Sequence, residues 1–239
     1  MKENIRLDKL ISDQLDLSRK QAKAAICAGL VQMDGQVATQ PEIKVNPDLV
    51  KVTYRNQLLT RKGYSYYMLN KPAGVVTATK DNIFRTVMDL FPEDLRQGLF
   101  PIGRLDKDTE GLLLITDDGR LSHDLLSPRK HVPKKYYVET RDSIREDAGE
   151  LFSEGVDIGE KKLTKPAKLE NLGEKQAYLI ISEGKFHQVK RMFEKTDNEV
   201  TYLKRVEMAG ISLDDTLTKG EFRPLREEEV EWLRKSIMQ

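Results

Sequence analysis

A charged loop that leads into an apolar strand is the part of the sequence best suited to chemistry. Residues 103–111 are rich in both charge signs, and four consecutive apolar residues, 112–115, follow them. Asp106 lies between Arg104 and Lys107, and cationic neighbours favour the ionised form of a carboxyl group. An ionised Asp can act as a nucleophile or as an electrostatic stabiliser. A surface turn whose Asp and Thr side chains cap the backbone is the structural alternative.

This loop and three other segments resemble, in the right order, the signature motifs of pseudouridine synthases. That family isomerises uridine in RNA: the N1–C1′ bond breaks, the uracil turns, and C5 bonds to C1′. The reaction moves no electrons or phosphate groups, so the resemblance implies an enzyme that needs no cofactor and no metal. The four segments are Asn70-Lys71-Pro72-Ala73-Gly74, Arg104 to Thr116, Lys134-Lys135-Tyr136-Tyr137, and Ser182 to Phe193.

The resemblance also assigns roles to single residues. Asp106 would attack or deprotonate the nucleoside, and attack at C1′, attack at C6 and a glycal route begun at C2′ all stay open. Tyr136 would stack on the uracil, and Arg104 would hold the target strand or fill the space left by the flipped base. Because a buried carboxylate needs a cationic partner, Lys190 or Arg191 would pair with Asp106. The motif alignment favours Lys190, and bidentate geometry favours Arg191.

Structural alternatives exist for these residues too. Lys190 and Arg191 could form a helix face that contacts phosphate, and Tyr136 could be a half-buried strand residue. Asp106 with Asp108 or Glu110 could also be the carboxylate pair of a glycosidase. No aromatic sugar platform surrounds these carboxylates, which disfavours the glycosidase.

The first 55 residues form a pattern of their own. Apolar residues recur at helical spacing from Leu7 to Leu15, and Ser18 with Gln21 has the spacing of a capping box that opens a second helix. A hairpin is expected around Asp34-Gly35, because Asp-Gly favours a tight turn between strands. A further strand is expected within residues 49–54, so we place one small domain at residues 1–60.

Basic residues gather on these two helices while the acidic ones lie elsewhere. Solvated helix faces are one interpretation. The segments Arg6 to Leu10, Ser18-Arg19, Gly29 to Val31 and Asp34-Gly35 resemble the S4 RNA-binding domain, which presents such cations to structured RNA. The residues expected to bind RNA are Arg6, Lys9, Arg19, Lys20 and Lys23.

An S4-like domain in front of the synthase motifs resembles the subfamily that acts on ribosomal RNA. The runs Leu163 to Ala167 and His187 to Phe193 are similar to the members that act on the small subunit. This resemblance implies uridine 516 of 16S ribosomal RNA as the target, in free RNA or in a small-subunit assembly particle. A target in 23S ribosomal RNA and a non-catalytic ribosome-assembly RNA-binding protein are the alternatives.

Residues 61–239 alternate strand and helix signals. Because the strands come in adjacent groups, we predict an α+β domain with a mixed, mainly antiparallel sheet flanked by helices. Strands are expected at 64–70, 75–78, 112–116, 136–140, 167–171, 177–182 and 200–208. Helices are expected at 86–90, 119–126, 144–154, 187–195 and 227–237.

Composition narrows the class of protein further. The 239 residues are 38% apolar and 33% charged with a net charge of +1, which suits a globular protein rather than a disordered chain. No apolar run approaches the roughly 18 residues that cross a membrane, and the N-terminus shows no secretory signal. A single Cys27 and three His make a structural zinc site unlikely to form, so no metal is expected. We expect a cytoplasmic monomer.

Overall fold

The computed structural model describes residues 4–15, 17–46, 49–59, 63–127 and 130–237. The chain divides into two compact units, residues 1–63 and 64–239. The boundary expected after residue 60 falls in a stretch, 60–62, that lies outside the described residues. The first unit has one buried apolar cluster and the second unit has two, so each unit is described separately.

The first unit packs two helices on small sheets. Helix α1 (Leu7–Leu15) is followed by α2 (Arg19–Cys27), and Ser18 and Gln21 form the predicted capping box at the start of α2. The sheet order is β3-β2-β5-β6, and β1 pairs with β4 separately. The predicted hairpin is present as β2 and β3. The strands are β1 (Ile5–Arg6), β2 (Val31–Met33), β3 (Gln36–Val37), β4 (Lys44–Val45), β5 (Val52–Tyr54) and β6 (Gln57–Leu58).

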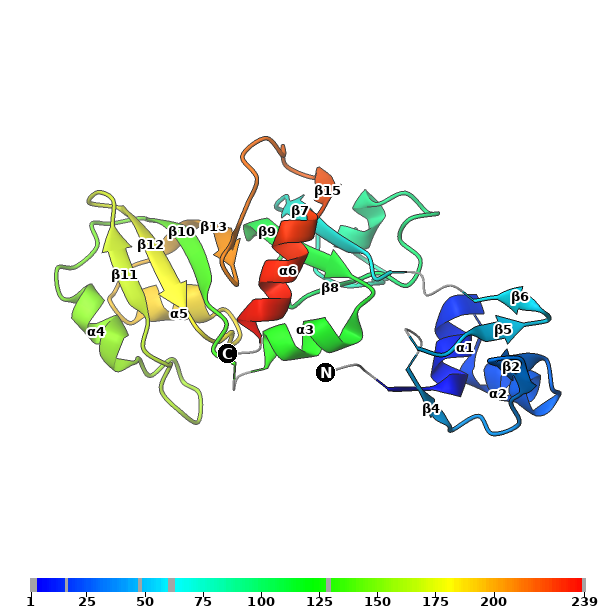
Figure 1. The fold of residues 1–239 in the computed structure, drawn as a ribbon. Coiled ribbons are helices and arrows are strands. Elements are labelled where there is room, and N and C mark those ends of the chain that lie inside the picture. The colour runs from blue at the N-terminus through cyan, green and yellow to red at the C-terminus, as the bar shows by residue number, and fades with distance from the viewer. Residues whose placement is uncertain (1–3, 16, 47–48, 60–62, 128–129, 238–239) are drawn as a thin grey trace. The chain divides into compact units, whose positions relative to one another are not determined.

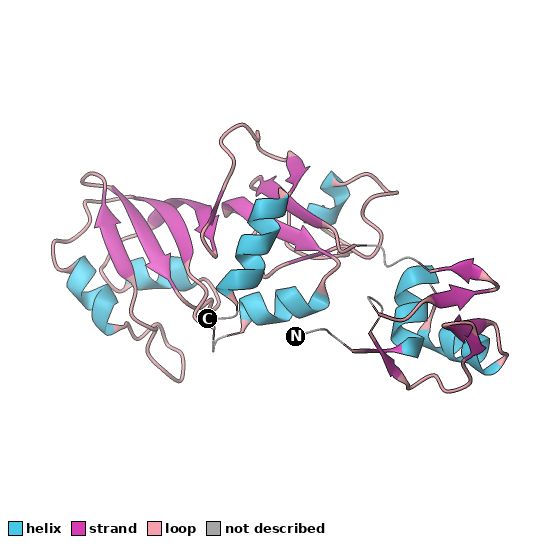
Figure 2. Cartoon of the chain, in the orientation of Figure 1, coloured by secondary structure: helices cyan, strands magenta, loops and turns pink. Residues whose placement is uncertain are grey.

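The second unit is built on one mixed sheet, as predicted (Figure 2). Its described strand pairs are antiparallel except β13 with β9, which run parallel. Short strands β8 (Phe100–Pro101) and β14 (Ile211–Ser212) pair with β9 and β13. The main order is β11 (Lys168–Asn171), β12 (Gln176–Ile181), β10 (Lys134–Thr140), β13 (Val200–Met208), β9 (Glu110–Thr116), β7 (Tyr66–Lys71) and β15 (Phe222–Pro224).

Helices cover different parts of this sheet (Figure 1). Helices α3 and α6 pack on the β9–β7 half, whereas α4 and α5 pack on the half that contains β10, β11 and β12. A 3₁₀ helix, η1, contributes buried residues to the same cluster as α4 and α5. The bounds are η1 (Val87–Leu90), α3 (Gly119–Leu126), α4 (Ala148–Glu154), α5 (Gln188–Glu194) and α6 (Glu227–Ser236).

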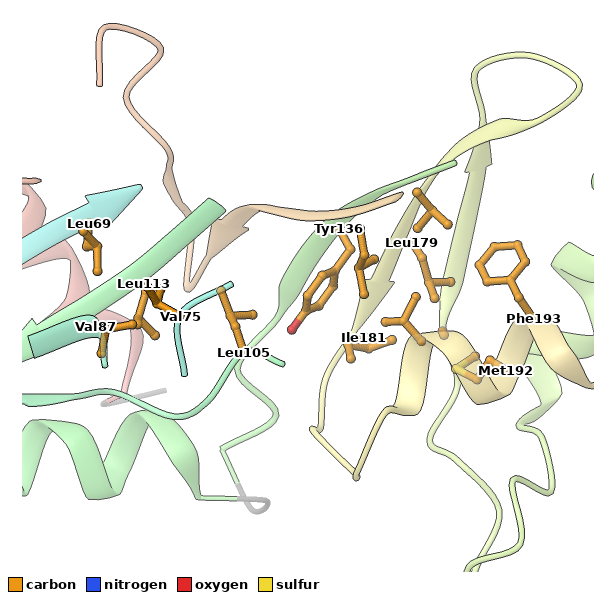
Figure 3. Packing of buried hydrophobic residues seen from close by; sticks show 14 of the residues in the cluster. Leu69, Val75, Val87, Leu105, Leu113, Tyr136, Leu179, Ile181, Met192 and Phe193 are labelled. Atoms are coloured by element: carbon orange, nitrogen blue, oxygen red, sulfur yellow. The ribbon is translucent and has the colours of Figure 1, made fainter. Parts of the chain in front are cut away.

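Strand β9 is buried along its whole length. Leu112 and Leu114 pack with α3 and α6, whereas Leu113 and Ile115 belong to the larger cluster with α4 and α5. That larger cluster reaches across the sheet to β10, where Tyr136 lies (Figure 3). Burial on both faces explains why this strand reads as a continuous apolar run instead of an alternating one.

One predicted strand is wrong. Residues 75–78 form only an isolated bridge between Val76 and Thr86, and the rest of the segment is irregular. The apolar side chain of Val75 is buried in the core, which produces the same sequence signal as a strand. The predicted helix at 86–90 is the 3₁₀ helix η1.

Candidate active site

A cleft of about 740 Å³ opens over the second unit. The loop between β8 and β9 forms one wall and carries Arg104 and Asp106. Strand β10 contributes Lys134 and Tyr136 to the opposite wall, and the segment 181–189 closes one end. Residues 80 or more positions apart in the chain therefore converge on one concave surface, which is the usual form of a ligand site.

The loop that bears Asp106 is fixed through its main chain. Thr77 Oγ1 donates a hydrogen bond to the Leu105 carbonyl and accepts one from the Leu105 amide, at 2.8 and 3.1 Å. The Gly74 amide donates to the Lys107 carbonyl at 2.8 Å. Asp106 is thus held on both sides by residues 74–77, which overlap the segment 75–78 that was predicted as a strand.

Lys71 also binds the backbone of the same loop. Its side chain is fully buried, and its Nζ donates to the carbonyls of Pro72, Lys107 and Thr109 at 3.0, 3.3 and 2.8 Å. Burial lowers the pKa of Lys71 to about 8, with the charges of Asp108 and Glu110 opposing that shift. Lys71 therefore holds the backbone of the loop and does not itself line the cleft.

The predicted ion pair of Asp106 with Lys190 or Arg191 is wrong in this structure. Lys190 Nζ instead contacts both carboxylate oxygens of Asp108, at 2.6 and 2.7 Å. Arg191 turns away toward Glu160 and the carbonyls of residues 158 and 186. Neighbouring residues on a helix point about 100° apart, so Lys190 and Arg191 cannot both face the loop.

A side chain beside Asp106 was given no role by sequence reasoning. His187 Nε2 lies 3.6 Å from Asp106 Oδ1, and the Asp106 side chain keeps 30% of its exposure. His187 caps α5 in the left-handed region, with φ 48°, and its ring stacks on Phe186 at 3.8 Å between centroids. The sequence signal for it was its place in the downstream motif, at the start of the run His187 to Phe193.

Tyr136 faces the cleft from β10, as expected. The strand alternates between buried and half-buried residues, which places Lys134 and Tyr136 on one face and Tyr137 on the other. Tyr137 donates to Glu139 and packs against Tyr178 and not into the cleft. Figure 3 shows the Tyr136 hydroxyl directed toward the side of the core where Leu105 lies, next to Asp106 in sequence.

The glycosidase alternative does not fit the carboxylates around Asp106. Glu110 is buried, accepts a hydrogen bond from Tyr202 at 2.7 Å and pairs with Lys219 at 2.7 Å. Burial opposes the ionisation of Glu110, but these two partners outweigh it and lower its pKa. Asp108 is paired with Lys190. Both potential partners of Asp106 are therefore committed to other groups.

The five basic residues expected to bind RNA lie on α1, on α2 and at the end of β1. Arg6 and Arg19 both contact Asp8, a fully buried carboxylate, at distances of 2.8 to 3.1 Å. Burial opposes the ionisation of Asp8, but the Arg6 hydrogen bond and the Arg19 charge outweigh it and lower its pKa. The remaining three, Lys9, Lys20 and Lys23, are exposed.

Within the described ranges, no three His, Cys, Asp or Glu side chains gather as a metal site would require. Among those same residues, no helix is long and apolar enough to cross a membrane.

Comparisons with known protein families agree with the geometry. Residues 65–195 match the family of RNA pseudouridylate synthases, and residues 5–50 match the S4 domain. The first match spans more than half of the chain and includes both Asp106 and Tyr136. The chain belongs to the RNA pseudouridylate synthase family.

Relatives of this synthase are similar over nearly their full length. The RNA pseudouridine synthase YtzG of Bacillus subtilis is 48% identical over 235 residues, which cover 96% of this chain and 98% of that one. The ribosomal small subunit pseudouridine synthase A of Escherichia coli is 44% identical over 227 residues, covering 95% and 98%. A crystal structure of a pseudouridylate synthase superposes with a TM-score of 0.70 at 39% identity, covering 96% and 99%.

Proposed function

We propose that this synthase converts uridine 516 of 16S ribosomal RNA to pseudouridine. The observation that carries the proposal is the convergence of Asp106 and Tyr136 on one cleft in a chain of this family. The 44% identity to a ribosomal small subunit pseudouridine synthase supports the choice of RNA. The S4 domain supports a structured RNA rather than a free nucleoside.

In this proposal, Asp106 supplies the charged group that attacks or deprotonates the target nucleoside. Its side chain is 30% exposed in the cleft, so a bound nucleotide is needed to exclude water from it. Tyr136 supplies a flat, buried surface for the uracil, and its hydroxyl takes the C5 proton. Arg104, exposed at the cleft, holds the target strand or fills the space left by the flipped base.

Lys190 and Arg191 have indirect roles in this proposal. Lys190 fixes the loop through Asp108, while Arg191 ties α5 to residues 158–160. Both keep His187, at the start of the same helix, beside Asp106. The first unit binds RNA phosphates through Lys9, Lys20 and Lys23, with Arg6 and Arg19 sharing their charge with Asp8.

The test is the release of tritium from RNA labelled with [5-³H]uridine, because isomerisation frees the C5 hydrogen. Free 16S RNA, a small-subunit assembly particle and 23S RNA are compared, and primer extension after carbodiimide treatment locates the product. Stoichiometric release from 16S RNA with a single product at position 516 is expected. Release from 23S RNA alone would move the target to the large subunit, and binding without release would indicate a non-catalytic assembly protein.

A further inference from the structure

Arg205 is a buried cation in the wall of the cleft. It is 1% exposed and lies on β13, where it pairs with Gly111 of β9. Its Nε donates to the Leu112 carbonyl at 2.7 Å, so the side chain bridges the two strands. Gly111, which has no Cβ, allows the Arg205 backbone to approach β9 at this point.

One nitrogen of this guanidinium has no partner. Nη2 of Arg205 is buried and makes no hydrogen bond with any residue that the structure describes. Leaving a buried donor unsatisfied is costly, more so when the group is charged. Since Arg205 lines the cleft, a bound molecule can supply the missing acceptor.

A second buried cation lies in the same wall. Lys134 is 9% exposed, lines the cleft, and donates to the Val132 carbonyl at 3.0 Å. Burial and then the charge of Arg205 lower the pKa of Lys134 to about 8. Among the described residues neither cation forms an ion pair with a carboxylate, although the charge of Glu183, which also lines the cleft, acts on Lys134.

The strand register places these cations beside the surface proposed for the base. Arg205 pairs directly with Tyr136 across β10 and β13, and Lys134 is two residues from Tyr136 on the same face. Directly opposed residues of antiparallel strands have Cβ atoms about 5 Å apart. A uracil stacked on Tyr136 therefore presents its edge to Arg205. The phosphates of the target strand remain near the exposed cations of the cleft, such as Arg104 and Lys107.

We propose that Arg205, assisted by Lys134, stabilises the negative charge that the uracil ring acquires when its bond to the ribose breaks. The inference rests on the proposed isomerase function. When N1–C1′ cleaves, its electron pair goes to N1 and the charge spreads to O2 and O4. The electrons of the ring form the new bond when C5 attacks C1′. The C5 proton then leaves and N1 takes up a proton from solvent, so the product is an isomer of the substrate and no oxidant or reductant is needed. Addition of Asp106 at C6 also puts negative charge on the ring, so the role does not depend on the route.

Kinetics of two substitutions test the role. Arg205→Lys keeps a charge that can reach the Leu112 carbonyl, and Arg205→Gln removes it. Losing one preorganised donor costs about 100-fold or more in the chemical step. We expect both variants to lose about that much in single-turnover tritium release, with RNA affinity close to that of the native protein. The matched control is Lys204→Gln, the neighbouring cation on the opposite face of β13, which should turn over normally.

A binding experiment separates charge stabilisation from a structural role. 5-Nitrouracil is an anion at neutral pH, whereas uracil is neutral, and both have the same ring. The native protein should bind the anion more tightly, and Arg205→Gln should abolish the preference. Inorganic phosphate should displace the anion poorly, since the cations are set beside a base and not a phosphate.

Three results would overturn the inference. The first is that the native protein binds 5-nitrouracil no more tightly than uracil. The second is that inorganic phosphate displaces 5-nitrouracil efficiently. The third is that Arg205→Gln slows tritium release no more than Lys204→Gln does. The binding experiment needs no catalysis. A protein that prefers the ionised ring but releases no tritium from any RNA would refute the proposed function and leave the cation site standing.

Discussion

Lys190 Nζ lies 2.6 Å from Oδ2 of Asp108, two residues beyond Asp106, and forms no ion pair with Asp106 itself. The pair joins α5 to the loop that carries Asp106. It leaves the carboxylate of Asp106 with His187 as its near neighbour. The two carboxylates in this loop therefore have separate tasks: one fastens the loop, and the other faces the cleft.

The separation of tasks predicts different results for two conservative substitutions. Asp106→Asn keeps the shape but removes the charge, so single-turnover tritium release should fall by at least about 1,000-fold while RNA binding persists. Asp108→Asn weakens a pair whose carboxylate is 69% exposed, and such pairs contribute about 0–1 kcal/mol. Its activity should stay within about tenfold of the native value. Appreciable turnover by Asp106→Asn would remove Asp106 from its proposed role.

The buried Lys71 predicts a particular dependence of stability on pH. Its folded-state pKa of about 8 is below the ordinary lysine value of 10.5, so between these values the unfolded chain binds more protons than the folded one. The contribution of Lys71 to the free energy of unfolding must then rise with pH across this window, by roughly 3 kcal/mol. We therefore expect the free energy of unfolding of the native protein, measured relative to that of Lys71→Met, to rise from pH 7.5 to pH 10. Lys80→Met, which replaces an exposed lysine, is the control. The prediction would be contradicted if the difference in the free energy of unfolding from the native protein did not change with pH for either variant.

Gly111 predicts a substitution that harms both stability and activity. A Cβ there would collide with the Arg205 carbonyl, and its φ of +98° is unfavourable for other residues. Gly111→Ala should lower the free energy of unfolding by at least about 2 kcal/mol and separate β9, which follows the Asp106 loop, from β13, which carries Arg205. The control is Gly149→Ala in α4, where a Cβ meets nothing within 4 Å and should be neutral or stabilising by up to about 1 kcal/mol. Equal melting temperatures for the two variants would contradict the prediction.

The basic residues of the first unit fall into two classes, those that contact the buried Asp8 and those that do not, and the two should respond differently to substitution. Lys20 and Lys23 are exposed, so their joint replacement by Gln should lower the slope of log affinity against log salt by about 0.7 for each lost phosphate contact. The stability of the unit should not change. Arg19→Gln should lower the slope and also destabilise the unit, since it removes a partner of the buried Asp8. Salt titrations and hydrogen exchange in α1 and α2 distinguish the classes. An unchanged slope would make the lysines solvated surface residues.

Local patterns predicted most of the regular elements well. The helices at 7–15 and 119–126 and the strand at 200–208 follow from spacing, caps and β-branched content. Two-residue strands such as β1 and β4 carry too few positions for a periodicity. Residues 75–78 produced a strand signal because one of them packs in the core, and tertiary contacts decided their conformation.

The site was harder to predict than the fold because its geometry depends on residues far apart in the chain. Motif resemblance selected Asp106 and Tyr136, both of which line the cleft. It also suggested Lys190 and Arg191 as partners for Asp106, because sequence order says nothing about which way a helix face points. Arg205 lies within a run of basic residues, and only the sheet register shows that it faces Tyr136.

The loop around Asp106 is held by contacts to its backbone. Thr77, Gly74 and Lys71 bind the amide or carbonyl groups of residues 105, 107 and 109, which every amino acid possesses. Substitutions at the exposed positions 104 and 107 can therefore alter what the cleft prefers without moving the carboxylate. Such a design allows descendants of one ancestral synthase to diverge in target while the reacting group stays in register.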